Sequence, residues 1–213
     1  MAALEKGITR NGEGFSGKTW NILGQVYFPK AVSDSTFAFE TNSEPGQFVP
    51  VHIHPTQEEF ILVQEGMLDL KLDGVWVRAR AGDLVRLPRG ISHGYFNKSD
   101  KPARALFWVS PSRKLEALFN QLHNLTDVAE IVRLSAEHEV NFLPEDANTE
   151  PSEIADPAHL SPRISAGTRE RGRSAMNSNK GDDQWSSRRL FALLARAWPA
   201  SPQQRHSPLA ATG

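Results

Sequence analysis

The stretch VPVHIHPTQEEFILVQEG, residues 49–66, decides the fold of this chain. It is an apolar run that contains two histidines, His52 and His54, and an acidic pair, Glu58 and Glu59, after a Pro-Thr-Gln turn. Side chains at i and i+2 of a strand share a face, so both imidazoles point the same way. Either they line a buried interior, or they are ordinary polar residues at the end of a strand.

Strand parity favours a buried interior. If Phe48 faces inward, so do His52 and His54; Glu59 shares the parity of the apolar positions after it, whereas Glu58 is predicted outside. Two imidazoles and a carboxylate buried together are costly unless a cation satisfies them. A set of two histidines and one carboxylate with open positions is typical of oxygen-activating iron sites. The alternative is a metal-free polar cluster.

The strand pattern extends over residues 20–110. Short apolar and β-branched runs alternate with Gly, Pro, Asn and Asp, and Asp73-Gly74 between two alternating runs predicts a hairpin. Such spacing is typical of an all-β sandwich or barrel. The runs are WNILGQVYF, STFAFET, QFVPVHIH, EEFILVQEG, MLDLKLDG, VWVRARAGD, LVRLPRG, SHGYFNKSD and ARALFWVS.

Helical patterns begin after Pro111. In SRKLEALFNQLHNL, four apolar residues recur with helical spacing, and in DVAEIVRLSAEHEV, Asp127 and Glu130 match a capping box at a helix start. We expect two short helices packed on the β domain, followed by an extended segment, VNFLP. The predicted buried residues are Leu115, Leu118, Phe119 and Leu122 in the first helix, and Val128, Ile131 and Leu134 in the second.

A fourth candidate ligand lies in GDLVRLPRGISHGYFN, residues 82–97. A strand would run to Leu87, Gly90 would permit the tight turn after Pro88, and a return strand would begin near His93. On that strand His93, Tyr95 and Asn97 share a face.

These two segments resemble the cupin superfamily. The first motif matches at Gly46, His52, His54, Glu59 and Gly66, and the second at Gly82, Pro88, Gly90, His93 and Asn97. The resemblance covers roughly residues 20–110, and the chain is most similar to bacterial single-domain cupins of the quercetin-dioxygenase-like kind. It implies a double-stranded β-helix (jelly-roll) barrel.

The same resemblance implies one divalent metal ion, Fe, Mn, Ni or Zn, held by His52, His54, Glu59 and His93. The implied function is a metal-dependent dioxygenase acting on a small aromatic or enolic, flavonol-like substrate, with Glu59 also serving as a catalytic base. Two alternatives stay open. One is a non-redox isomerase, epimerase or cyclase that uses the ion as a Lewis acid, and the other is a non-catalytic binder of a small ligand.

Four aromatic side chains are candidates for the wall of a substrate pocket: Phe48, Tyr95, Phe107 and Trp108. Plain core packing is the alternative for each of them.

Composition narrows the partners. The chain has no cysteine, so a metal site must use nitrogen and oxygen ligands. With 24 basic and 25 acidic side chains it offers no electrostatic reason to bind nucleic acid or an anionic membrane. The first residues lack the apolar core of a signal peptide, so we expect a cytoplasmic protein. Single-domain cupins pair through sheet edges, so we also expect a homodimer.

The predicted organisation has four parts: an N-terminal arm (1–19), the cupin barrel (20–110), a helical extension packed on it (111–145) and a tail (146–213). The tail is polar, lacks an apolar period and is predicted to be disordered. Its one amphipathic stretch is RRLFALLARAW, residues 188–198.

Overall fold

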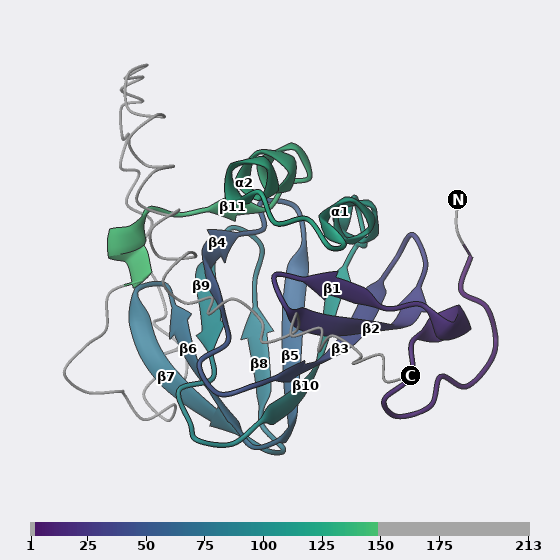
Figure 1. Cartoon of the computed structure of the whole chain (residues 1–213), viewed down its shortest axis with the longest axis horizontal. Coiled ribbons are helices and arrows are strands. Elements are labelled where there is room, and N and C mark those ends of the chain that lie inside the picture. Colours follow the sequence, from purple (N-terminus) through teal and green to yellow (C-terminus); the bar gives the residue numbers. More distant parts are fainter. Residues whose placement is uncertain (1–2, 149–213) are drawn as a thin grey trace, which may run out of the picture.

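The computed structural model describes residues 3–148, and in this part of the chain two antiparallel sheets face each other (Figure 1). The six-stranded sheet has the order β1-β2-β3-β10-β5-β8, and the five-stranded sheet has the order β11-β4-β9-β6-β7. From β3 to β10 the chain changes sheet at every step except between β6 and β7, which makes the molecule the double-stranded β-helix barrel that the sequence predicts.

The elements follow the predicted runs closely. The strands are β1 (Trp20–Ile22), β2 (Gln25–Val32), β3 (Phe37–Ser43), β4 (Phe48–Ile53), β5 (Glu58–Glu65), β6 (Met67–Leu72), β7 (Val75–Arg80), β8 (Leu84–Leu87), β9 (Ser92–Phe96), β10 (Ala103–Ser110) and β11 (Asn141–Phe142). The helices are α1 (Leu115–Leu122) and α2 (Val128–Glu137), with 3-10 turns η1 (Phe15–Gly17) and η2 (Glu145–Asn148).

The first predicted run is two strands rather than one. Leu23 and Gly24 both have positive φ, 50° and 77°, and they reverse the chain so that Trp20 pairs with Tyr27. Two consecutive left-handed residues give the hairpin turn whose twist matches the flanking strands. Apolar periodicity alone did not reveal this turn because its first position is a leucine.

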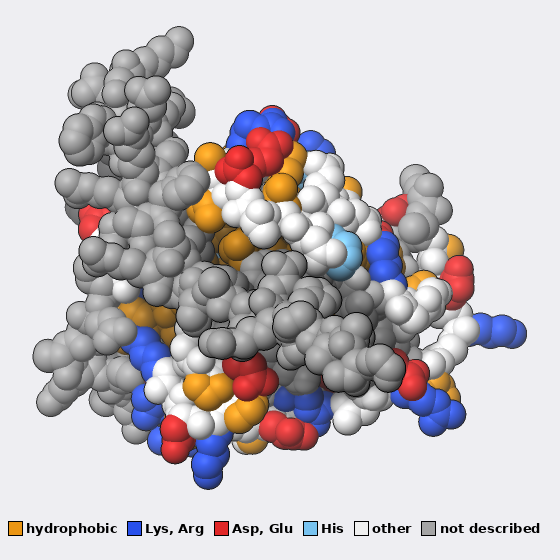
Figure 2. All heavy atoms as spheres, viewed as in Figure 1, with side chains coloured by type: hydrophobic (Ala, Val, Ile, Leu, Met, Phe, Trp, Pro, Cys, Tyr) orange, Lys and Arg blue, Asp and Glu red, His pale blue; other side chains and the backbone are white. Residues whose placement is uncertain are grey.

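The two helices lie over one end of the barrel (Figure 1). Asp127 caps α2, its carboxylate accepting from the backbone nitrogens of Ala129 and Glu130. The Glu130 side chain pairs with Arg133, so half of the predicted capping box forms. Figure 2 shows the charged side chains gathered over the outer side of α2, whereas Ile131 and Leu134 are buried below. The helices therefore close the barrel mouth with their apolar faces.

Ordered contacts continue past the boundary expected at residue 145. Asn148 is buried, and its Oδ1 accepts from the backbone nitrogen of Val51 on β4 at 2.8 Å. β11 pairs with β4 through Asn141 and Phe142, which confirms the extended segment expected at VNFLP. The rest of the predicted tail, with RRLFALLARAW, lies outside the described residues.

Candidate metal centre and its cavity

A β-bulge sets the facing of the residues on β4. Val49 pairs with Tyr95 and His52 pairs with His93, so three steps on β4 correspond to two on β9. Gly94 lies opposite the extra residue, and a Cβ there would come within 2.9 Å of Val49 O and Val51 N. A bulge of this kind shifts strand parity by one position.

Phe48 lines the cavity as the sequence led us to expect, but the bulge changes the direction in which strict alternation points it. Its ring stacks on that of Phe96, its ladder partner, at 5.4 Å, so it belongs with the outer side chains of the sheet although it borders the cavity described below. Val49 takes the inward place that strict alternation assigned to Phe48. His52 keeps its predicted inward facing because it follows the bulge.

The four predicted ligands come together between the two sheets. His52 lies on β4 and His93 on β9, directly opposite each other in the ladder; His54 follows β4, and Glu59 lies on β5 in the other sheet. All four are buried, and one ligand atom from each lies within 4.8 Å of the others. The cluster could therefore hold one metal ion.

Every imidazole in the cluster has its Nδ1 beside a carbonyl oxygen. The Nδ1 atoms of His52, His54 and His93 lie 2.8 Å from Pro50 O, 3.1 Å from Gln57 Oε1 and 3.1 Å from Ile91 O, respectively. A carbonyl can only accept, so each Nδ1 carries a proton, and in a neutral ring the Nε2 lone pair is left free. Partners of this kind orient histidine ligands in metal sites.

The Nε2 atoms converge. His52 Nε2 lies 3.2 Å from His54 Nε2, and Glu59 Oε2 lies 2.8 Å from His93 Nε2 and 3.6 Å from His54 Nε2. Facing lone pairs repel unless a proton or a cation lies between them. With the proton between His93 and Glu59 displaced, three nitrogen lone pairs and one carboxylate aimed at a common point fit a divalent transition metal.

The protonation of the cluster favours metal binding. Burial lowers the pKa of His52 well below 6.5, with added repulsion from His93 and His54, and burial also lowers the pKa of His54. Burial by itself would raise the pKa of Glu59, but the hydrogen bond with His93 and the charges of His93 and His54 outweigh it and lower the pKa. Deprotonated donors are the forms that bind metal.

Glu58 faces away from the cluster. Its side chain is 46% exposed and pairs with Arg89 at 3.3 Å. This is the facing that strand parity predicts, so of the two adjacent acids the structure brings Glu59 to the histidines.

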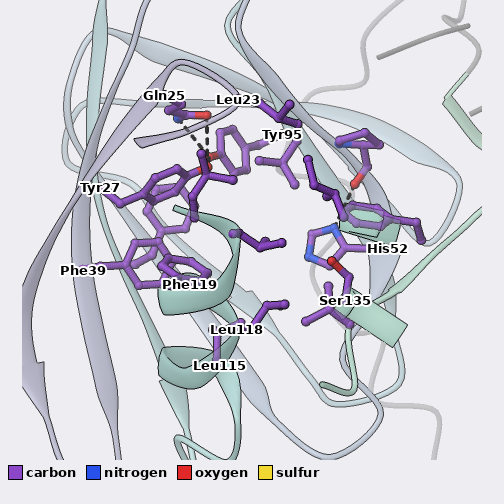
Figure 3. A pocket seen from close by; sticks show the side chains of 18 of the residues that line it. Leu23, Gln25, Tyr27, Phe39, His52, Tyr95, Leu115, Leu118, Phe119 and Ser135 are labelled. Atoms are coloured by element: carbon purple, nitrogen blue, oxygen red, sulfur yellow. Dashed lines mark hydrogen bonds between the residues drawn. The ribbon is translucent and has the colours of Figure 1, made fainter. Parts of the chain in front are cut away.

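An apolar cavity of about 110 Å³ opens beside the cluster. Figure 3 shows its wall, to which Phe39 and Tyr95 come from the sheets and Leu115, Leu118 and Phe119 from α1. Phe107 also lines it. Trp108 does not line the cavity. It is the neighbour of Phe107 on β10 and therefore points to the outer side of the sheet, where its ring stacks on Phe60 at 5.2 Å.

The polar atoms at one wall of the cavity form a network. Gln25 Nε2 donates to Tyr95 Oη at 3.0 Å, and Tyr27 Oη donates to Gln25 Oε1 at 3.2 Å. Burial raises the pKa of Tyr27 to about 12 and that of Tyr95 well above 10, so both hydroxyls stay protonated. Tyr95 was predicted from the sequence, whereas its partners Gln25 and Tyr27, which precede the first motif, were not.

Two further residues of the site were missed. Gln57 lies in the turn between two predicted ligands. Its position between a histidine and a glutamate could have marked it as a hydrogen-bond partner of a ligand. Ser135 lines the cavity from α2 at the position where the helical apolar pattern, Val128 and Ile131, would continue. A polar residue within the apolar stripe of a helix could have marked Ser135 as a residue of the site.

Comparisons with known proteins agree with the geometry. Residues 39–109 match the family model "Cupin domain". This chain contains a cupin domain.

Known proteins match this cupin domain over part of their length. The polyketide synthase protein CurC of Streptomyces cyaneus is 39% identical over 67 residues, which are 32% of this chain and 44% of that protein. Quercetin 2,3-dioxygenase of Bacillus subtilis is 38% identical over 56 residues, or 26% of this chain and 17% of that protein. The chain thus spans less than half the length of these two curated relatives.

Among solved structures, KdgF from Halomonas sp. is 19% identical with a TM-score of 0.45, and the match covers 50% of this chain and 99% of that one. None of the helices within residues 3–148 is long and apolar enough to cross a membrane.

Proposed function

We propose that this protein is a metal-dependent dioxygenase of a small aromatic or enolic substrate. The observation that carries the proposal is the juxtaposition of the four-donor cluster and the apolar cavity, since His52, His54 and Glu59 all line that cavity. A ligand in the cavity would have its ring among aromatic and aliphatic side chains and an oxygen beside the metal donors. The match with quercetin 2,3-dioxygenase supports this reaction class.

In this proposal His52, His54, Glu59 and His93 hold one divalent ion, which could be Fe, Mn, Ni or Zn. When bound, the ion supplies Lewis acidity and, for the redox-active metals, electron transfer to dioxygen. The Glu59 carboxylate, which lies at the cavity wall and which its lowered pKa keeps ionised, would accept the enol or phenol proton of the substrate through an oxygen that does not hold the ion. Apolar side chains of α1 and α2 line the cavity beside these donors.

The test begins with metal content. Protein purified without a histidine tag is analysed for metal, and oxygen uptake is measured with flavonols, catechols and β-diketones. The proposal expects about one ion per chain and one O2 consumed per substrate. His93→Ala should lower metal content well below one per chain, whereas the matched control Glu58→Gln should leave it unchanged. Full metal occupancy in His93→Ala would contradict the four-ligand site.

A second candidate is a non-redox cyclase or isomerase acting on an enolic substrate. The match with a polyketide synthase protein over 67 residues favours it. Product formation without oxygen, with tightly bound zinc, would select this candidate over the dioxygenase. Ligand binding without any product would select a non-catalytic binding protein.

We also propose a cytoplasmic homodimer. Support for the dimer comes from the open sheet edges β7 and β8, where Val75 and Leu84 are 42% and 50% exposed. Exposed edges with apolar residues tend to be covered by a partner. Light scattering on the full chain should give twice the monomer mass, and a monomer mass would contradict the dimer.

A further inference from the structure

Helix α2 has one buried polar atom without a hydrogen-bond partner on a residue that lines the cavity. Ser135 is 1% exposed, and within residues 3–148 its Oγ is one of three buried side-chain atoms without a hydrogen bond, with Glu40 Oε1 and Gln64 Oε1. Of the three residues, Ser135 lines the cavity. Figure 3 shows it at the cavity wall on the side of His52. Burying a hydroxyl without a partner is unfavourable, so a ligand that completes its hydrogen bond would be favoured.

The polar groups of Gln25, Tyr27 and Tyr95 at the cavity wall already have hydrogen-bond partners within the protein. The amide of Gln25 bonds to Thr41, Ser43 and Tyr95, and Tyr27 bonds back to Gln25. This network is satisfied within the protein. Ser135 is therefore the group whose hydrogen-bonding capacity is left for a ligand.

The size of the cavity limits that ligand. A cavity of roughly 150 Å³ takes up benzene, and the cavity here is about 110 Å³. A cavity of this size leaves room for no more than about one ring next to the metal donors. A three-ring flavonol would require α1 and α2 to move apart.

We infer that Ser135 Oγ is a specificity-determining contact, which binds an oxygen atom of a one-ring substrate whose neighbouring oxygen lies at the metal donors. This inference rests on the proposed function and narrows its substrate class to compact rings or enols with two adjacent oxygens, such as catechols. The remainder of the ring packs against Leu118 and Phe119.

The test is a cycle of two ligands and two proteins. Catechol has two adjacent oxygens and phenol has one, so the extra affinity for catechol should depend on Ser135. Wild type and Ser135→Ala are loaded with Zn²⁺, which does not oxidise the probe, and binding is measured by calorimetry. Loss of one neutral hydrogen bond should weaken catechol binding by about 3- to 10-fold and leave phenol binding unchanged.

Stability separates this role from a structural one. Ser135→Ala removes an unpartnered buried hydroxyl, so its melting temperature without ligand should equal or exceed that of wild type. The matched control is Ser112→Ala, since Ser112 is also buried but donates to Asp34 O. It should bind catechol as wild type does.

Three outcomes would overturn the inference. Equal catechol affinity in wild type and Ser135→Ala, with one zinc per chain in both, would remove the Ser135 contact and leave the proposed function standing. Tighter binding of quercetin than of catechol would refute the one-ring size. Wild type that retains no zinc would refute the proposed function, and the inference with it.

Discussion

Gln57 Oε1 lies 3.1 Å from His54 Nδ1, and this contact fixes which ring nitrogen of His54 is left for a metal. The amide cannot be reversed, because Gln57 Nε2 donates to Pro111 O at 3.0 Å and to Ser112 O at 2.8 Å. The segment after β10 therefore orients His54 through the Gln57 amide.

Gln57→Leu should weaken metal binding without removing a ligand. Leucine has a similar size but cannot accept from Nδ1, so the His54 ring loses its preferred tautomer and orientation. Outer partners of this kind typically contribute about 10- to 100-fold to metal affinity. Zn²⁺ titration in the presence of a competing chelator measures the change. An affinity equal to that of the control Glu58→Gln would show that His54 is oriented by packing alone.

Glu59→Gln should separate binding from catalysis. Three imidazoles can still hold an ion, whereas an amide is uncharged and accepts a proton poorly. We expect metal to be largely retained and turnover per bound metal to fall by about 10²- to 10⁴-fold, as is typical for loss of a general base. The measurement is steady-state rate normalised to metal content. Equal normalised rates would exclude Glu59 from the reaction.

The metal-free protein should lose stability as pH falls. Burial lowers the pKa of His52 well below 6.5 and also lowers the pKa of His54, so below pH 6.5 the unfolded chain binds protons that the folded chain does not. Stability falls with decreasing pH wherever the unfolded state binds more protons than the folded state. The lowered pKa of Glu59 acts in the same direction at more acidic pH, since its contribution is present above 4.5 and is lost below.

Melting of the metal-free protein at pH 7.5 and pH 5.5, values chosen to lie about one unit on either side of the usual histidine pKa, measures this effect. His52→Gln removes one of the two buried neutral imidazoles and should have a shallower pH dependence. Identical slopes for the two proteins would show that His52 does not contribute.

Gly94→Ala should destabilise the barrel next to the site. The added Cβ would meet Val49 O and Val51 N at 2.9 Å, and neither backbone atom can move without breaking the bulge. Overpacking of this kind typically costs about 1–3 kcal/mol in the free energy of unfolding. Urea denaturation of metal-free protein measures it, with Gly7→Ala as the control because nothing lies within 4 Å of that position. Equal unfolding midpoints would mean that the bulge adapts.

Local pattern predicted most of the fold but not its irregularities. Alternation and turn residues located the strands, and the spacing around His52, Glu59 and His93 identified the cluster that the structure assembles. Asn97, the last position of the second motif, donates from its Nδ2 to Ser43 O and Lys101 O and so ties two loops together. Strict alternation misplaced Phe48, because a bulge depends on what lies across the ladder, and that neighbour is Gly94.

The cavity was less predictable for a related reason. Whether Phe107 or Trp108 faces inward follows from the pairing of β10 with β5, where Phe107 meets Ile61 and Trp108 meets Phe60. Ser135 and Gln25 reach the cavity from segments far apart in sequence. Their roles emerge only when α2 and β2 are brought to the same end of the barrel.

The division of the donors between sheets has a mechanical consequence. His52 and His93 belong to the five-stranded sheet and Glu59 to the six-stranded one. An ion held by all of them would join the two sheets and stabilise the folded barrel, because the unfolded chain has no assembled site for it. With the ion bound, the two sheets could separate only if the ion were released. The closed barrel would then last as long as the metal stays bound.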